Sequence, residues 1–278
     1  MVLAPFAARS SMRKLHAQGV TTKRSREKLG HATQPRPQAG PLVWLHAASV
    51  GESLSVLALI TRMGQMLPTA QFLITSGTAT SAKLVAQRLP PRTIHQFAPL
   101  DAPRPVKRFL KHWHPDAAIF VESELWPQML RRTHATGARM ALVNARMSEK
   151  TVSFWADWPR AARYIFDVFA LILTQNDAMA RNMLRMHAPE DRVARGVNLK
   201  SLAGPLPVDA NALPEVRETL ADRPTWVASS THDGEERAVL SAHRTLLKRF
   251  PDLCLILAPR HPERGDIVED LIKAAGLS

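Results

Sequence analysis

The sequence predicts an α/β fold, in which a parallel sheet is covered by helices on both faces. Short apolar runs recur along the chain and alternate with segments whose apolar residues follow a helical period. Small and polar residues follow most of these runs, as they do where a strand leads into a helix. The alternation stops at Gly204-Pro205-Leu206-Pro207 and then restarts. The pattern is typical of parallel sheets, and the restart indicates a second domain.

The expected elements follow from run length and from the residues that bound each run. Two strands after the break are fewer than an open sheet usually contains, so residues 205–278 are expected to be the beginning of a second α/β domain. Before the break we expect strands at 41–46, 71–75, 93–97, 117–121, 139–144 and 170–174, and helices at 54–66, 81–88, 106–112, 127–136 and 179–186. After it we expect strands at 226–230 and 254–258, and helices at 233–249 and 266–275.

The basic charge is concentrated at the N-terminus. The 278 residues include 37 Lys and Arg against 24 Asp and Glu, a net charge of +13. Residues 1–40 carry about half of this excess, because Glu27 is their single acid. Three interpretations are open: a solvated and partly disordered leader, a basic segment facing the phosphates of an anionic membrane, or a nucleic-acid-binding arm. Nucleic acid is disfavoured, because the arm has no interleaved aromatic residues and the chain has no zinc-finger or RNA-recognition motif.

Two classes of feature are excluded by composition. No apolar run approaches the roughly 20 residues that a membrane span needs. A single cysteine, Cys254, rules out an intramolecular disulfide framework and a zinc site built from several cysteines. Candidate chemistry must therefore be sought elsewhere, and in parallel sheets ligands bind at the carboxyl ends of the strands.

The first strand end offers two competing interpretations. Glu52 is expected at the start of a helix, either as an ordinary N-terminal cap or as a general base aimed into a cleft. Ala47-x-Ser49-x-Gly51 is a relaxed nucleophile elbow, which would make Ser49 the nucleophile of a hydrolase. The stricter motif has Gly at the position of Ala47, so this second interpretation is weaker.

The second strand end is rich in small hydroxyl residues. Thr75-Ser76-Gly77-Thr78 suits a phosphate or sugar at a helix N-terminus, although helix capping explains it equally well. It is not a P-loop, because the Gly-x4-Gly-Lys spacing is absent.

Charged groups follow later strands. Glu122 and Glu124 come directly after an apolar strand, where unpaired carboxylates are costly to bury, so hydroxyl or cation recognition is favoured. Arg260 and Arg264 present guanidinium groups suited to phosphate, with ordinary surface charge as the alternative. Residues 229–236 include His and acidic residues, but their spacing is poor for a metal, and no metal is expected.

These segments together resemble the 3-deoxy-D-manno-octulosonic acid (Kdo) transferases of lipopolysaccharide synthesis. The order and spacing hold from about residue 41 to the end, and eight ordered segments are far more specific than any one of them. The segments are Trp44 to Glu52, Thr75 to Thr78, Phe97 to Asp101, Glu122 to Pro127, Val143 to Ser148, Asn198 to Lys200, Ser230 to Glu236 and Pro259 to Arg264.

The resemblance implies a GT-B-type glycosyltransferase with two Rossmann-like domains, the first complete here and the second only begun. It implies an inverting transfer of Kdo from CMP-Kdo to a glucosamine hydroxyl of a lipid A precursor (lipid IVA), without a metal or other cofactor. It further implies an anionic membrane surface as a partner and the cytoplasmic face of the bacterial inner membrane as the location.

The resemblance also assigns roles to individual residues. Glu52 matches the base that deprotonates the acceptor hydroxyl, and Arg260 with His261 matches the contact to the donor phosphate. Positions expected to bind substrate are Ser49, Gly51, Thr75, Ser76, Thr78, Glu122, Glu124 and Arg146.

Three segments are expected on this basis. Residues 1–40 form a basic arm that is the remnant of a membrane-anchor region, 41–204 the acceptor-side domain, and 205–278 the beginning of the nucleotide-sugar domain. The family continues beyond residue 278 with further nucleotide contacts, so a non-catalytic fragment that binds only acceptor is one alternative. A serine hydrolase that uses Ser49 is the other.

Overall fold

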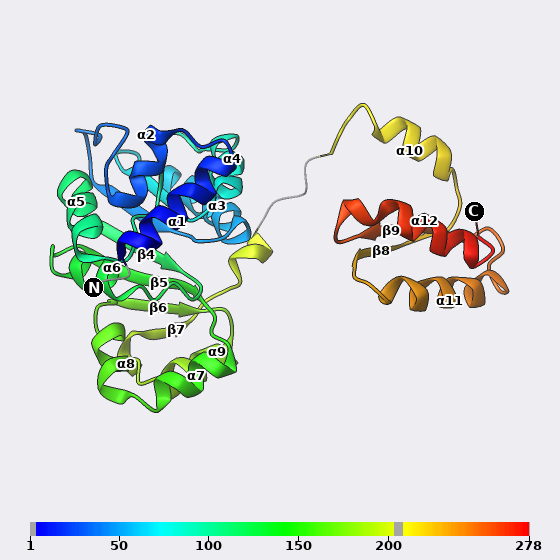
Figure 1. Ribbon diagram of the computed structural model, residues 1–278. Coiled ribbons are helices and arrows are strands. Elements are labelled where there is room, and N and C mark those ends of the chain that lie inside the picture. Colours follow the sequence, from blue (N-terminus) through cyan, green and yellow to red (C-terminus); the bar gives the residue numbers. More distant parts are fainter. Residues whose placement is uncertain (1–3, 203–207, 278) are drawn as a thin grey trace. The chain divides into compact units, whose positions relative to one another are not determined.

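The chain divides into two compact units, Met1–Gly204 (unit 1) and Pro205–Ser278 (unit 2). The computed structural model describes residues 4–202 and 208–277. Strands and helices alternate in both units (Figure 1), and every strand pair is parallel. The predicted α/β class is therefore confirmed.

Unit 1 contains a seven-stranded sheet in the order β3-β2-β1-β4-β5-β6-β7. The chain runs outward from β1 through β2 to β3, and then returns to place β4 on the other side of β1. In such sheets the point where the order reverses leaves a crevice at the carboxyl ends of the two neighbouring strands. The strands are β1 (Leu42–His46), β2 (Gln71–Ser76), β3 (Thr93–Phe97), β4 (Ala117–Val121), β5 (Arg139–Ala145), β6 (Leu171–Thr174) and β7 (Val193–Arg195).

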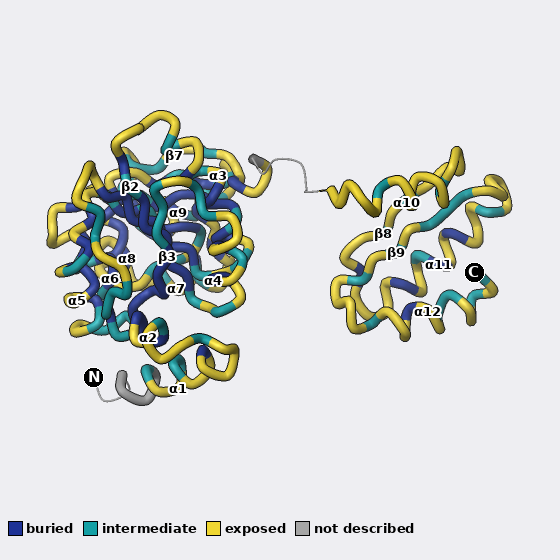
Figure 2. The backbone as a smooth tube through the Cα atoms, turned by 90° about the horizontal axis from the view of Figure 1, so that it is seen from above, coloured by how far each residue is buried: buried dark blue, intermediate teal, exposed yellow. Residues whose placement is uncertain are grey.

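Two apolar layers cover the faces of this sheet. Trp44 of β1 belongs to a buried cluster with helices α5, α6, α8 and α9, whereas its neighbour Leu45 belongs to a second cluster with α3 and α4. Adjacent strand residues point to opposite faces, so both faces are buried, as parallel sheets require. Figure 2 shows the strands of unit 1 as its buried interior. The helices are α3 (Val50–Met66), α4 (Ala79–Ala86), α5 (Pro103–Trp113), α6 (Pro127–His134), α7 (Glu149–Ala156), α8 (Pro159–Phe166) and α9 (Asp177–Arg185), with short 3-10 turns η2 (Glu190–Arg192) and η3 (Leu199–Leu202).

Capping residues explain where the structure departs from the predicted boundaries. Helix α3 begins at Val50, four residues before the predicted start at 54, because the Ser49 side chain caps it. Helix α9 begins after Asn176, whose side chain accepts a hydrogen bond from the Met179 amide. Helices α7 and α8 and strand β7 are short segments that were not predicted.

The N-terminal arm packs on unit 1. It forms α1 (Ala4–Ala17), α2 (Thr22–Ser25) and η1 (Arg26–Leu29). Leu15 is buried against Phe97, and the carboxylate of the fully buried Glu27 accepts the Phe97 amide at 2.7 Å and the Thr33 hydroxyl. A solvated leader is therefore wrong for this part of the arm, and unit 1 includes it instead of beginning at residue 41. No helix in residues 4–202 or 208–277 is both long and apolar enough to span a bilayer.

The described part of unit 2, residues 208–277, contains two strands, as the sequence predicts. Helices α11 and α12 contribute the buried side chains Leu240 and Val268, whereas Val227 and Ile256 on the strands are exposed. Figure 2 shows this contrast with the buried sheet of unit 1. The elements are α10 (Leu213–Leu220), β8 (Thr225–Thr231), α11 (Glu235–Leu247), β9 (Cys254–Pro259), η4 (Pro262–Arg264) and α12 (Gly265–Ala274).

Candidate functional site

A buried polar network lies at the carboxyl end of β1, where the sheet order reverses. The Trp44 indole donates to the Thr75 hydroxyl at 2.8 Å, and the same hydroxyl lies 2.9 Å from Nδ1 of His46. His46 is 2% exposed and its Nε2 lies 3.2 Å from Oε2 of Glu124, which follows β4. The neighbouring ends of β1 and β4 are thus joined by side chains, and Glu124 is brought to the point where parallel sheets bind ligands.

Glu124 is held as a carboxylate. Burial by itself raises its pKa, but the hydrogen bond and charge of His46, together with the Trp126 indole, bring that pKa below its ordinary value. Asp101 lies in the same region and accepts the backbone amides of Gln128 and Met129 at the start of α6. Burial raises the pKa of Asp101, and those two amides and the nearby His46 oppose the rise. Two acids therefore surround one buried imidazole.

Glu122 lies beside a cation. Its Oε1 is 2.9 Å from Nζ of Lys200 and accepts a hydrogen bond from the Asn144 amide at 3.3 Å. Glu122 and Asn144 both have φ of 56°, a left-handed backbone conformation that is uncommon outside glycine and is frequent at functional sites. Asn144 Oδ1 also accepts the amide of Leu199, which fixes the segment that carries Lys200. Lys200 also lies near Gly51: its Cε is 3.8 Å from the position that a Cβ on Gly51 would occupy. The Lys200 side chain therefore connects the end of β4 with the start of α3.

Glu52 takes part in the cap of α3. Its Oε1 accepts the Ser49 hydroxyl at 2.7 Å and its Oε2 accepts the Ala48 amide at 2.9 Å. The Glu52 amide in turn donates to the Ser49 side chain, so the two residues form a capping-box arrangement. The structure therefore shows the helix cap directly. The Glu52 carboxylate lies at the same edge of the sheet as Glu122 and Glu124. Ser49 has an extended backbone (φ −99°) and no histidine bonds its hydroxyl among the described residues, so the hydrolase interpretation has no support.

The hydroxyl-rich segment after β2 is divided between interior and surface. Thr75 and Ser76 are fully buried, and Ser76 lies 2.9 Å from Nε2 of His95, so both hydroxyls bond inside the domain and neither is open to substrate. Thr78 caps α4 by accepting the Ser81 amide. Gly77 and Thr78 line a cavity of about 440 Å³ with Ser49 and Val50 of the β1 end, and with residues of α1 that include Lys14. Two of the predicted substrate-binding residues, Ser49 and Thr78, thus line an open cavity.

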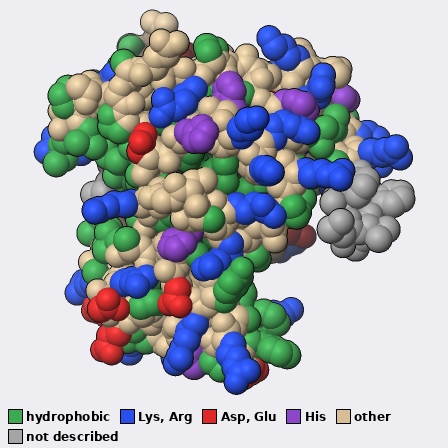
Figure 3. Space-filling view, turned by 90° about the vertical axis from the view of Figure 1, so that its left-hand side faces the viewer, with side chains coloured by type: hydrophobic (Ala, Val, Ile, Leu, Met, Phe, Trp, Pro, Cys, Tyr) green, Lys and Arg blue, Asp and Glu red, His purple; other side chains and the backbone are tan. Residues whose placement is uncertain are grey.

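Arg146 is exposed directly after β5. It thus lies at the same edge of the sheet as the acids, and its contact with substrate stays a prediction. The wider surface of unit 1 is basic, as Figure 3 shows for one face, where Lys, Arg and His side chains greatly outnumber Asp and Glu.

The two arginines after β9 in unit 2 have different surroundings. Arg260 is exposed, and among residues 4–202 and 208–277 its hydrogen bonding is limited to the backbone amide, which donates to the Thr231 carbonyl. Arg264 instead donates to Asp233 at 3.1 Å and to the fully buried Glu236 at 3.2 Å, so it is part of the structural core of unit 2. His261 is exposed and pairs with Glu263. Arg260 and His261 are therefore the groups available to a ligand at this strand end.

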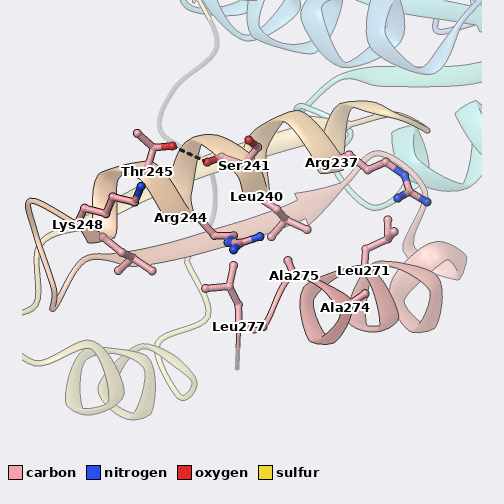
Figure 4. A pocket seen from close by; sticks show the side chains of 12 residues that line it. Arg237, Leu240, Ser241, Arg244, Thr245, Lys248, Leu271, Ala274, Ala275 and Leu277 are labelled. Atoms are coloured by element: carbon pink, nitrogen blue, oxygen red, sulfur yellow. Dashed lines mark hydrogen bonds between the residues drawn. The ribbon is translucent and has the colours of Figure 1, made fainter.

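A separate hollow of about 560 Å³ lies between α11 and α12 (Figure 4). Leu240 and Leu271 line it with Arg237 and Arg244, and it includes neither Arg260 nor His261. Within the described residues, no three His, Cys, Asp or Glu side chains are close enough together to hold a metal ion.

Comparison with known proteins identifies the family. The family model described as 3-deoxy-D-manno-octulosonic-acid transferase (kdotransferase) matches residues 23–203. The chain belongs to the Kdo transferase family. A probable mitochondrial Kdo transferase of Arabidopsis thaliana is 32% identical over 258 residues, which cover 91% of this chain and 57% of that protein. The Kdo transferase of Rickettsia felis is 36% identical over 86% of this chain and 51% of its own. The chain thus spans about half the length of these relatives.

Solved structures with low sequence identity share the fold of this Kdo transferase family member. UDP-GlcNAc 2-epimerase from Neisseria meningitidis gives a TM-score of 0.58 at 12% identity, over 84% of this chain and 70% of that one. A glycosyltransferase from Rickettsia africae gives 0.55 at 14% identity, over 85% and 66%. This likeness supports the expected GT-B architecture.

Three residues of the site were not singled out from the sequence. His46, Asn144 and Lys200 all lie in segments that carry the family resemblance, yet none was given a role. The signal for His46 and Asn144 is their place at the carboxyl ends of β1 and β5. Lys200 lies far along the chain in a short 3-10 turn, and only the folded structure brings it to Glu122.

Proposed function

We propose that this chain supplies the acceptor-side domain, and the first part of the donor-side domain, of an inverting Kdo transferase. In this proposal Kdo passes from CMP-Kdo to a glucosamine hydroxyl of a lipid A precursor. The observation that carries it is the gathering of Glu122 with Lys200, and of Glu124 with His46, where the sheet order reverses. Family membership supports Kdo as the transferred sugar.

Glu52 is the proposed base. Its Oε1 already accepts a hydrogen bond from the Ser49 hydroxyl at 2.7 Å, which is the contact that a general base makes with the hydroxyl it deprotonates. In the reaction the acceptor hydroxyl takes the place of the Ser49 hydroxyl and attacks the anomeric carbon as the bond to CMP breaks. One carboxylate base is sufficient for inversion, because a phosphate leaving group requires little protonation.

Unit 2 is proposed to hold the donor. CMP departs as a phosphate monoester, and a fixed cation stabilises the charge that develops on it. Arg260 suits this role because its guanidinium makes no hydrogen bond within the described residues, whereas Arg264 is already bound to Asp233 and Glu236. His261, beside it, is the second proposed contact.

The proposed location is the cytoplasmic face of the bacterial inner membrane. Arg9, Arg13 and Lys14 lie on the exposed part of α1, and each such cation adds about 1 kcal/mol of attraction near an anionic bilayer. Lys14 also lines the cavity beside Ser49 and Thr78, which places one cation next to the proposed acceptor site. A phosphorylated lipid acceptor agrees with both features.

The proposal is tested by Kdo transfer to lipid IVA with the 278-residue chain and its E52Q variant. E149Q is the matched control, because Glu149 is also an acid in the first turn of a serine-capped helix but lies exposed on α7. We expect transfer that is lost in E52Q and kept in E149Q. A transfer defect in S49A with full activity in E52Q would overturn the role of Glu52.

The non-catalytic alternative is tested by CMP binding. If the chain transfers no Kdo and binds CMP only weakly, in the millimolar range or not at all, the donor site is incomplete and the chain is an acceptor-binding fragment. Binding of CMP that is weakened in R260A, together with transfer, supports the complete proposal.

A further inference from the structure

The imidazole of His46 lies inside the domain, yet it contacts an acid at the edge of the sheet. Its Nε2 lies 3.2 Å from Oε2 of Glu124 as a close charge contact, but it has no hydrogen-bond partner of good geometry among the described side chains. The rest of the ring is enclosed by Trp44 and Phe120, at centroid distances of 6.3 and 5.6 Å. A buried polar nitrogen that faces one group alone depends on that group for its hydrogen bond.

For a neutral His46 ring, the hydrogen bonds of Thr75 favour one tautomer. The Trp44 indole can only donate, so the Thr75 hydroxyl accepts from it. The single proton of that hydroxyl is then given to Nδ1 of His46 at 2.9 Å, in preference to the Leu45 carbonyl at 3.5 Å. Nδ1 is thus an acceptor, and the neutral ring carries its proton on Nε2, which faces Glu124.

The two oxygens of Glu124 are used unequally. His46 Nε2 and the Trp126 indole both approach Oε2, whereas Oε1 makes no hydrogen bond within residues 4–202 and 208–277. The side chain is 12% exposed, so the carboxylate is anchored by one oxygen and open at the other. The free Oε1 can accept a hydrogen bond from a hydroxyl or ammonium group, and the contacts of Oε2 already set the direction of that bond.

We propose that His46 is a positioning residue: with its tautomer set by Thr75, it holds Oε2 of Glu124 so that Oε1 points to a hydroxyl or amino group of the acceptor sugar. The identity of that sugar rests on the proposed function, whereas the tautomer and the pairing do not. A carboxylate held in this way is oriented before the ligand arrives, so less rotational freedom is lost on binding.

The tautomer is tested first, in the unmodified 278-residue chain, by ¹⁵N NMR of its histidine rings. We expect His46 in the Nε2–H form, with a ring-nitrogen shift that changes in E124Q. T75V, which removes the hydroxyl at nearly constant volume, is expected to lose that single tautomer, and T75S to keep it. An Nδ1–H ring in the unmodified chain, or a His46 signal unaffected by E124Q, overturns the inference.

The positioning role is tested by binding of lipid IVA dispersed in detergent micelles. We expect H46L to weaken binding about tenfold, the loss typical of a hydrogen bond to a charged group, and H46Q to restore it to within about threefold because its amide can donate near the position of Nε2. Equal binding by H46L and the unmodified chain overturns the role. If the unmodified chain does not bind lipid IVA while the tautomer is as expected, the proposed acceptor is wrong and the His46–Glu124 pairing stands.

Discussion

His95 gives unit 1 a sensitivity to acid. The residue is 8% exposed on β3, and Arg24 donates to its Nδ1 at 2.8 Å, so the ring proton is on Nε2 and is directed to Ser76. Burial, and then the positive charges of Arg24 and Lys28, lower the pKa of His95 from 6.5 to about 3. The negative charge of Glu27 is nearby, but it already accepts hydrogen bonds from Arg24.

The sign of the effect follows from proton binding. Between pH 6.5 and about 3 the unfolded chain protonates this histidine and the folded chain does not, so stability falls as the pH falls through that window. One pH unit inside the window is worth about 1.4 kcal/mol, so lowering the pH from 7.5 to 5.0 removes about 2 kcal/mol. That is a large part of the total stability of a typical domain, about 5–15 kcal/mol.

The measurement is urea unfolding at the two pH values, followed by tryptophan fluorescence. A W226F background confines the emission to unit 1, because the other five of the six tryptophans lie there. Other titrating groups also contribute, so the comparison is with H95Q, which cannot be protonated. We expect the loss between pH 7.5 and 5.0 to be about 2 kcal/mol smaller in H95Q. The same loss in both proteins would refute the reasoning.

Three further predictions concern stability and are measured by urea unfolding. E27A is expected to lower the free energy of unfolding by about 3 kcal/mol, because a fully buried acceptor of a backbone amide is removed. R24A is expected to lower it by about 1 kcal/mol, because the Arg24 side chain is 35% exposed. A comparable loss in the two variants would contradict this. G30A is expected to cost about 3 kcal/mol, since its Cβ would stand 2.0 Å from a backbone oxygen at φ +80°, and G19A, with the same φ and open space, about 1. Equal costs would show that contact is not the cause. R264A is expected to unfold unit 2 by leaving a buried carboxylate without its cation, at about 3 kcal/mol or more, and an unchanged Trp226 transition would refute it.

The fold of unit 1 was largely predictable because its strands are short apolar runs with polar ends. Six of its seven strands lie where the sequence places them. Helix α3 begins at Val50 and not at residue 54, because the Ser49 side chain caps it; Glu52 was expected near this helix start, as a cap or as a base. The helices α7 and α8 were not predicted: each is eight residues long, and their buried side chains, such as Val152 of α7 and Phe166 of α8, pack into the cluster that covers one face of the sheet.

The sequence predicts which edge of the sheet carries the site, but it does not predict which acidic and basic side chains pair there. Strand ends identify Glu52, Glu122 and Glu124 from the sequence alone. Which cation faces which acid depends on strand order, and the neighbours β1 and β4 are separated in the chain by β2 and β3. The pairing of Glu122 with Lys200, 78 positions apart by residue number, follows from that order and from Asn144.

The basic charge of the arm has two physical roles that composition cannot separate. Arg24 is used inside unit 1, where it bonds Glu27 and His95, and Arg36 donates to the Trp113 carbonyl at 2.7 Å. These charges stabilise the fold and are not free to bind a partner. The exposed cations of α1, including Arg9 and Arg13, have no such bonds among the described residues. The proposed attraction to an anionic surface is therefore assigned to α1, and because exposed charges are screened within about 10 Å at 0.1 M salt, it should weaken with salt while the contacts of Arg24 and Arg36 persist.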